Sequence, residues 1–157
     1  MLVLIYILSI SCSNLLASKY GVWITPFTAF FLIGLELVIR DVLHHRISKL
    51  KMVLIVLAAG VASFLINSDS LMIAIASFLA VVLSGIIDYV VYSKAKGEWI
   101  IKTNTSNFFS SMTDSVVFVV VAFGSFSTPV ILSQWLAKFA GGFIWSLIVI
   151  KLAKKTP

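Results

Sequence analysis

Long apolar runs separated by short polar stretches dominate this chain. Six runs can be delimited, at residues 2–17, 24–39, 52–66, 71–92, 113–126 and 129–150. Most of them approach the length of about 20 residues that an α-helix needs to cross a bilayer. The pattern predicts an all-α polytopic membrane protein with six transmembrane helices. We expect residues 1–157 to form a single transmembrane domain.

Composition supports this interpretation and excludes a sizeable soluble domain. Of the 157 residues, 61% are hydrophobic and only 11% are charged, whereas soluble domains carry about 25% charged residues. The mean hydropathy is +1.11. No basic residue precedes the first apolar run, so we expect a retained helix and not a cleaved signal peptide.

The positions of the basic residues predict the orientation in the membrane. If six helices alternate, one side of the membrane receives ten of the twelve Lys and Arg residues, and the other receives only Lys19. Because basic residues collect on the cytoplasmic side, both termini are expected to be cytoplasmic. The ten residues are Arg40, Arg46, Lys49, Lys51, Lys94, Lys96, Lys102, Lys151, Lys154 and Lys155.

The net charge of +6 is explained by these boundary residues. No basic stripe interleaved with aromatic residues indicates a nucleic-acid surface, so no nucleic-acid partner is expected. The single cysteine, Cys12, excludes an internal disulfide and a cysteine-based metal cluster. His44 and His45 lack an evident third ligand, so we expect no metal site and no cofactor.

Several polar residues fall within the apolar runs or at their ends, where they need a partner or a hydrated cavity. Some are spaced i, i+4 and therefore share one face of a helix. These residues are Asn14 and Lys19 in the first run, Glu36, Arg40 and Asp41 in the second, Ser84, Asp88 and Tyr92 in the fourth, Asp114 in the fifth, and Gln134 and Lys138 in the sixth.

A purely structural interpretation of the same residues stays open. Glu36 and Arg40 could form an intrahelical ion pair, and Arg40 and Asp41 could be solvated at the cytoplasmic boundary. Asp114, at the predicted start of the fifth helix, could be stabilised by the helix dipole. The interpretation as a site rests on carboxylates from three helices in the cytoplasmic half of the membrane.

The chain lacks the motifs that would indicate an enzyme. It has no phosphate-binding GxxxxGK[ST] loop, no HExxH pair and no G-x-S-x-G nucleophile elbow. A pore, a carrier or a packing subunit remains.

Several strings, taken in order, resemble the vitamin-uptake-transporter (VUT) family, and within it the YhhQ-like queuosine-precursor transporters. The resemblance covers about residues 14–123. The strings are Asn14–Lys19, Pro26–Phe30, Gly34–His44, Asp88–Tyr92, Trp99, Asn104–Asn107 and Asp114–Phe118.

This resemblance implies an importer of a 7-deazapurine, preQ0 or preQ1, in the cytoplasmic membrane. A guanine-like edge offers two adjacent N–H donors that one carboxylate can accept, and its ring would stack on an aromatic face. The expected substrate-binding residues are Asn14, Glu36, Asp88, Tyr92, Trp99, Asn104, Asn107 and Asp114. The expected coupling or gating residues are Lys19, Arg40, Asp41, Gln134 and Lys138.

Two alternatives stay open. The first is a transporter of the same architecture for another nucleobase or vitamin. The second is a substrate-binding membrane subunit that needs a partner ATPase for transport. The compact chain also leaves open a homodimer that encloses a path through the bilayer.

Overall fold

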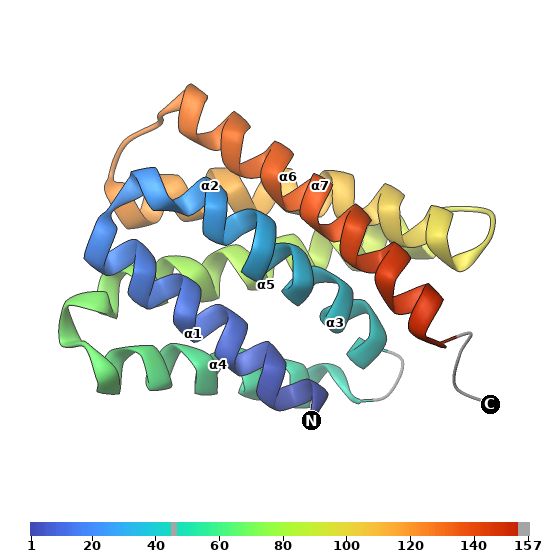
Figure 1. Ribbon diagram of the computed structural model, residues 1–157, viewed down its shortest axis with the longest axis horizontal. Coiled ribbons are helices and arrows are strands. Elements are labelled where there is room, and N and C mark those ends of the chain that lie inside the picture. Colours follow the sequence, from blue (N-terminus) through green and yellow to red (C-terminus); the bar gives the residue numbers. More distant parts are fainter. Residues whose placement is uncertain (45–46, 154–157) are drawn as a thin grey trace.

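The computed structural model describes residues 1–44 and 47–153, and nearly all of them are helical (Figure 1). No β-strand occurs in these ranges. In chain order the elements are α1 (Leu2–Tyr20), η1 (Val22–Ile24), α2 (Thr25–Thr28), η2 (Ala29–Ile33), α3 (Gly34–His44), α4 (Lys49–Ile66), η3 (Ser68–Ser70), α5 (Leu71–Lys94), α6 (Trp99–Phe123) and α7 (Thr128–Ala153).

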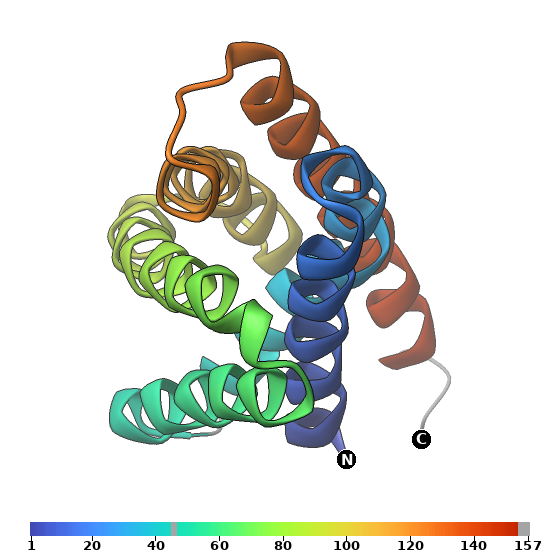
Figure 2. The same ribbon diagram turned by 90° about the vertical axis from the view of Figure 1, so that its left-hand side faces the viewer.

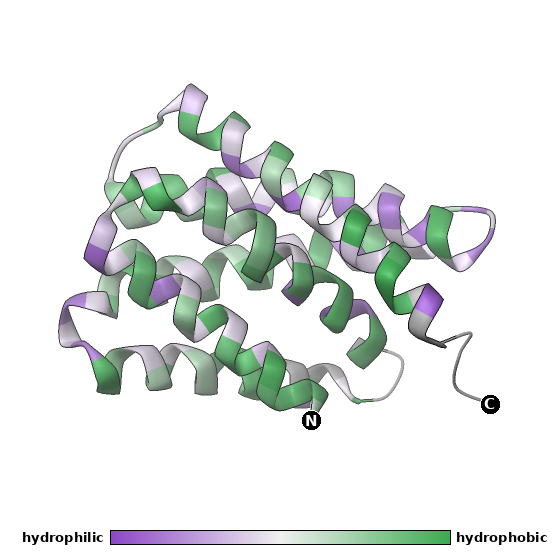
Figure 3. Cartoon of the chain, in the orientation of Figure 1, coloured by the Kyte–Doolittle hydropathy of each residue, from purple (hydrophilic) through white to green (hydrophobic). Residues whose placement is uncertain are grey.

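Five helical segments of the described chain are long and apolar enough to cross a membrane, and α4 adds a shorter apolar helix over Leu54–Ile66. Hydrophobic residues occur along all the helices (Figure 3), and many of the large ones are exposed. These features confirm the predicted all-α, polytopic membrane architecture. The five segments are Leu2–Tyr20, Val22–Leu43, Ser68–Lys94, Trp99–Phe123 and Thr128–Val149.

The two ends of the bundle differ in charge. The turn at residues 95–98 and the last turns of α7 lie at one end, which we call the basic end, whereas the turns at 67–70 and 124–127 lie at the opposite end (Figure 1). Lys94, Lys96 and Lys151 are exposed at the basic end. His45, Arg46, Lys154 and Lys155 lie outside the described residues, as do the side chains of His44 and Lys49.

The second span is longer than its apolar run predicts. It runs without a break from Val22 to His44 through η1, α2, the π-helical η2 and α3. Pro26 lies in the first turn of α2, where its missing N–H is tolerated. Arg40 and Asp41 therefore lie inside the helix, and both are buried. The alternative interpretation, in which they are solvated at the boundary, is therefore wrong.

The fifth span begins at Trp99, not at Thr113. The polar stretch at residues 99–112 is the first half of α6, because its serines and asparagines find helical partners. Asn104 donates to the Ile100 carbonyl at 2.8 Å and Ser106 to the Thr103 carbonyl at 3.2 Å. Polar residues here mark a buried helix face, as in many membrane helix interfaces.

Because α6 begins at Trp99, Asp114 lies deeper in the bundle than a residue at the start of a helix would. The residue lies in the second half of α6, closer to Phe123 than to Trp99, so it belongs to the half of the bundle away from the basic end. The helix-dipole explanation fails for the same reason, because that effect is confined to the first turn of a helix.

The helices pack around a small apolar core and a polar interior. Tyr6 and Ile10 of α1 pack with Ile39 of α3 and with Val56 and Ala59 of α4. Seen along the bundle, α5 and α6 lie side by side, and α7 covers α2 and α3 (Figure 2). Most other buried positions are small or polar, which favours close approach of helices in a membrane.

Candidate functional site

A cavity of about 20 Å³ lies between α1, the second span, α5, α6 and α7. This is room for about one water molecule, whereas pockets for small organic ligands measure about 300–1,000 Å³. The conformation is therefore closed. Its polar lining residues are Ser13, Asn14, Thr25, Thr28, Glu36, Ser77, Asp114, Gln134 and Lys138, and its apolar ones are Ala29, Ile33, Val81 and Phe118.

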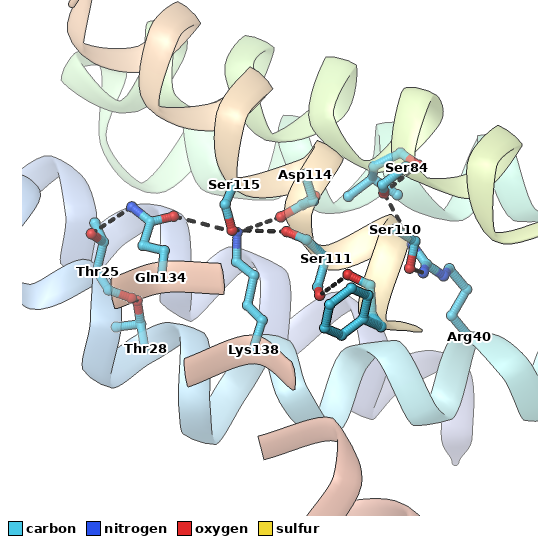
Figure 4. Close-up of polar contacts among 12 residues, drawn as sticks. Thr25, Thr28, Arg40, Ser84, Ser110, Ser111, Asp114, Ser115, Gln134 and Lys138 are labelled. Carbon is cyan, nitrogen blue, oxygen red and sulfur yellow. Dashed lines mark hydrogen bonds and ion pairs between the residues drawn. The ribbon is translucent and has the colours of Figure 1, made fainter. Parts of the chain in front are cut away.

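A continuous hydrogen-bonded chain crosses this cavity from α6 to α2 (Figure 4). The Lys138 ammonium donates to the Asp114 carboxylate and, at 3.3 Å, to the Gln134 side-chain oxygen. The Gln134 amide nitrogen donates to the Thr25 hydroxyl at 2.7 Å. We call Thr25, Asp114, Gln134 and Lys138 the lysine cluster.

The local sequence explains this geometry. Gln134 and Lys138 are four residues apart on α7, so they project from the same face. Both are buried, with exposures of 1% and 3%. A buried ammonium is tolerated only when a carboxylate and further acceptors surround it. Asp114 and Gln134 provide these acceptors, which explains why a lysine is tolerated in the middle of an apolar helix.

The opposite wall of the cavity comes from α1 and α3. The Asn14 amide donates to the Ser63 hydroxyl of α4 at 3.3 Å. Glu36 is 1% exposed, and the Tyr6 side chain of α1 lies near its carboxylate. One oxygen of Glu36 has no hydrogen-bond partner among the described residues. This carboxylate therefore keeps acceptor capacity beside the cavity.

A second polar group lies next to the cavity, one turn further along α3 toward the basic end. The Arg40 guanidinium donates to the Ser84 hydroxyl at 3.2 Å and to the Ser110 hydroxyl at 3.4 Å (Figure 4). Its Nη2 lies 4.0 Å from an oxygen of Asp88. Arg40 thus joins α3 to both α5 and α6.

Asp41 extends this group by one residue. Its carboxylate accepts a hydrogen bond from the Asn107 amide at 3.4 Å, and the two side chains are 3% and 1% exposed. We call Arg40, Asp41, Ser84, Asp88, Asn107 and Ser110 the arginine cluster. It lies between the cavity and the basic end, because Arg40 and Asp41 follow Glu36 along α3 toward that end (Figure 1).

Close backbone contact fixes α7 against the second span. A Cβ atom on Gly141 would lie 2.1 Å from the Phe30 carbonyl oxygen, and one on Gly34 would lie 2.7 Å from the Gly141 carbonyl carbon. Phe30 lies in the π-helical turn η2, and π-helical turns frequently occur at functional sites. Two glycines therefore allow α7 to bring Lys138 onto the cavity.

The structure brings most of the predicted site residues together, in two adjacent clusters. Asn14, Glu36 and Asp114, with Gln134 and Lys138, line the cavity. Asp88 and Asn107, with Arg40 and Asp41, form the arginine cluster. Glu36 and Asp114 thus share one cavity, whereas Asp88 does not line it.

Four other predicted residues do not line the cavity. Lys19 is exposed at the end of α1, where its ammonium lies 5.3 Å from the centre of the Tyr20 ring. Trp99 begins α6 and Asn104 bonds to its own helix. The Tyr92 ring lies 5.9 Å from the Lys102 ammonium near the basic end.

Sequence reasoning missed Tyr6, Thr25 and Ser110. Ser110 carried a usable signal, since it lies four residues before Asp114 and shares its face of the helix. Thr25 is a small hydroxyl residue beside a proline, and Tyr6 lies in an otherwise apolar run. Neither has a sequence feature that separates it from ordinary membrane-helix residues.

Comparison with known proteins gives one match. Residues 2–153 match the family model described as "Putative vitamin uptake transporter". No curated protein and no solved structure matches the chain.

Proposed function

The chain belongs to the vitamin-uptake-transporter family, and from that premise we propose that it imports a queuosine precursor across the cytoplasmic membrane. The substrate is a 7-deazapurine, preQ0 or preQ1. The observation that carries this proposal is the buried cavity, in which two carboxylates, two amides and one ammonium group converge.

These groups match the hydrogen-bonding edge of a guanine-like base. A carboxylate accepts the two adjacent N–H donors of such an edge, and the ring carbonyl accepts from an ammonium or amide. Asp114 supplies the carboxylate, and Lys138 and Gln134 supply the donors. These residues already bond to one another, so a ligand can replace contacts that exist in the closed state.

The remaining walls suit the rest of the ligand. Phe118 lines the cavity and provides an aromatic face for a planar ring. The Glu36 side chain lies on the α3 side of the cavity, where its carboxyl oxygen would accept a hydrogen bond from the aminomethyl group of preQ1. The substrate preference between preQ0 and preQ1 therefore depends on Glu36.

Transport requires this cavity to open toward each side in turn. Because about 20 Å³ is too small for a base, the helices around the cavity must separate to admit one. The arginine cluster closes the path toward the basic end and consists of hydrogen bonds and an ion pair. We propose that Arg40 and Asp41 form the inner gate, with the basic end in the cytoplasm.

Uptake by the purified chain tests the proposal. The chain alone, reconstituted in liposomes, is expected to take up labelled preQ1, and unlabelled preQ0 is expected to compete. Preferential competition by guanine or an unrelated vitamin would indicate another substrate. Binding without uptake would indicate a subunit that needs an ATPase partner.

A cellular measurement complements this assay. In cells that cannot synthesise the precursor, queuosine in transfer RNA should appear only when both the external precursor and this chain are present. The Asp114→Asn variant, produced at the same membrane level, serves as the matched control.

A further inference from the structure

The buried charges of the bundle do not balance. Among the described residues, the buried charged side chains are four carboxylates and two cations, namely Glu36, Asp41, Asp88, Asp114, Arg40 and Lys138. Each is less than a tenth exposed. An ionised carboxylate in an apolar interior is very costly unless it is paired, and otherwise it is neutralised. Two carboxylates therefore need neutralisation that the buried cations do not supply.

The contacts identify these two carboxylates. Asp114 is paired with Lys138, and Asp88 is the carboxylate within 4.0 Å of Arg40. Glu36 and Asp41 remain, on either side of Arg40 along α3. Neither has an ion pair within 4.0 Å in the described chain.

The groups that face Glu36 come from four helices. Tyr6 projects from α1, Arg40 from the same helix as Glu36, Asp114 from α6 and Lys138 from α7. The two cations in this set are engaged by other carboxylates, as described above. One Glu36 oxygen has no hydrogen-bond partner among the described residues, so no described donor stabilises a negative charge on it.

Asp41 has a comparable environment. It faces Arg40 and Glu36 of α3, Asp88 of α5, and the Asn107 amide of α6. The neighbouring Asp88 carboxylate disfavours a second negative charge at this position. The described side chains of α4 include no buried charged group.

We infer that the closed protein holds two protons, one on Glu36 and one on Asp41, and that these protons couple uptake to the pH gradient. A proton neutralises a carboxylate without the shell of oxygen ligands that a metal cation requires. The statement that these protons couple uptake to the pH gradient rests on the proposed function. In each cycle the Asp41 proton leaves at the basic end, the Glu36 proton moves to Asp41, and a new proton enters from the opposite end of the bundle and binds Glu36 beside the cavity.

Infrared spectroscopy of the purified protein tests the protonation without any ligand. Protonated carboxyl groups have a carbonyl stretch that carboxylates lack, and the wild-type protein is expected to show it at neutral pH. Glu36→Gln and Asp41→Asn should each remove one contribution. Asp69→Asn, at an exposed residue of η3, should remove none. A wild-type spectrum without this band would overturn the inference even if no variant could be purified.

Transport measurements in proteoliposomes test the coupling. Wild-type protein should exchange preQ1 without a gradient and accumulate it when the basic end faces the more alkaline compartment. Asp41→Asn should abolish pH-driven accumulation, because Asp41 carries one of the two protons, whereas Asp69→Asn, at an exposed residue of η3, should keep both exchange and accumulation. Accumulation driven by sodium and unaffected by pH would overturn the coupling while leaving the proposed function intact. Absence of exchange in the wild type would count against the proposed function, and the infrared band would still decide whether the protons are present.

Discussion

Lys138 of α7 donates to the Asp114 carboxylate of α6 inside the cavity, so the two charges nearest the expected ligand neutralise each other in the closed state. The pair also links α6 to α7. A ligand that takes over the Asp114 carboxylate must break this contact. Under the proposed function, a ligand that binds Asp114 would therefore release Lys138 of α7 from this ion pair.

Replacing Asp114 with asparagine is expected to abolish uptake. The substitution removes the acceptor for the base edge and leaves Lys138 buried without a counter-charge, which typically costs about 3–5 kcal/mol. Uptake and thermal unfolding in detergent check both effects. The double variant Asp114→Asn with Lys138→Gln should recover stability without recovering uptake. Full uptake by the single variant would contradict the assigned role.

Replacing Gly141 with alanine is expected to destabilise the bundle. The new Cβ would lie 2.1 Å from the Phe30 carbonyl oxygen, so α7 or η2 must shift and the cavity must deform. Gly85→Ala is the matched control, because nothing lies within 4 Å of its Cβ position and alanine favours a helix by up to about 1 kcal/mol. Thermal unfolding should show a lower midpoint for Gly141→Ala only. Equal midpoints would mean that the helices separate there without cost.

The spans that could be predicted from the sequence are those in which apolar residues face both lipid and neighbouring helices. The run at residues 71–92 corresponds closely to α5. The start of the fifth span was predicted wrongly because the first half of α6 has Ser106, Asn107 and Ser110 on its buried face. The hydropathy of such a segment, averaged over successive residues, is that of a polar stretch, although its exposed positions include Ile101 and Phe109.

Most residues of the two clusters could be predicted from the sequence, but the contacts between them could not. Spacing of i, i+4 placed Gln134 with Lys138 and Glu36 with Arg40, since one helix determines those neighbours. The partners across helices, such as Asp114 for Lys138, depend on how the helices rotate and cross. That arrangement depends on Gly34 and Gly141 and on the π-helical turn η2. No pattern of residues in the sequence predicts these close contacts.

Replacing Arg40 with lysine is expected to impair uptake, although the positive charge is retained. Arg40 contacts Ser84 and Ser110 through two different nitrogens, and one ammonium cannot reproduce this fork. Hydrogen bonds that involve charged groups contribute about 1.5–3 kcal/mol each, so the loss of one should lower the midpoint of unfolding. Lys94→Arg, at an exposed position of the basic end, is the control. Unchanged transport and stability in Arg40→Lys would show that charge alone suffices.

Labelling of introduced cysteines should establish which side of the membrane each end faces. Cys12 is the only cysteine, so a Cys12→Ala background is free of other thiols. Ser125→Cys and Lys96→Cys introduce thiols at exposed positions between α6 and α7 and between α5 and α6. Because basic residues favour the cytoplasm, an impermeant maleimide should label Ser125→Cys in intact spheroplasts and Lys96→Cys only after permeabilisation. The reverse pattern would place the arginine cluster on the outer side of the cavity and reverse the proposed direction of proton movement.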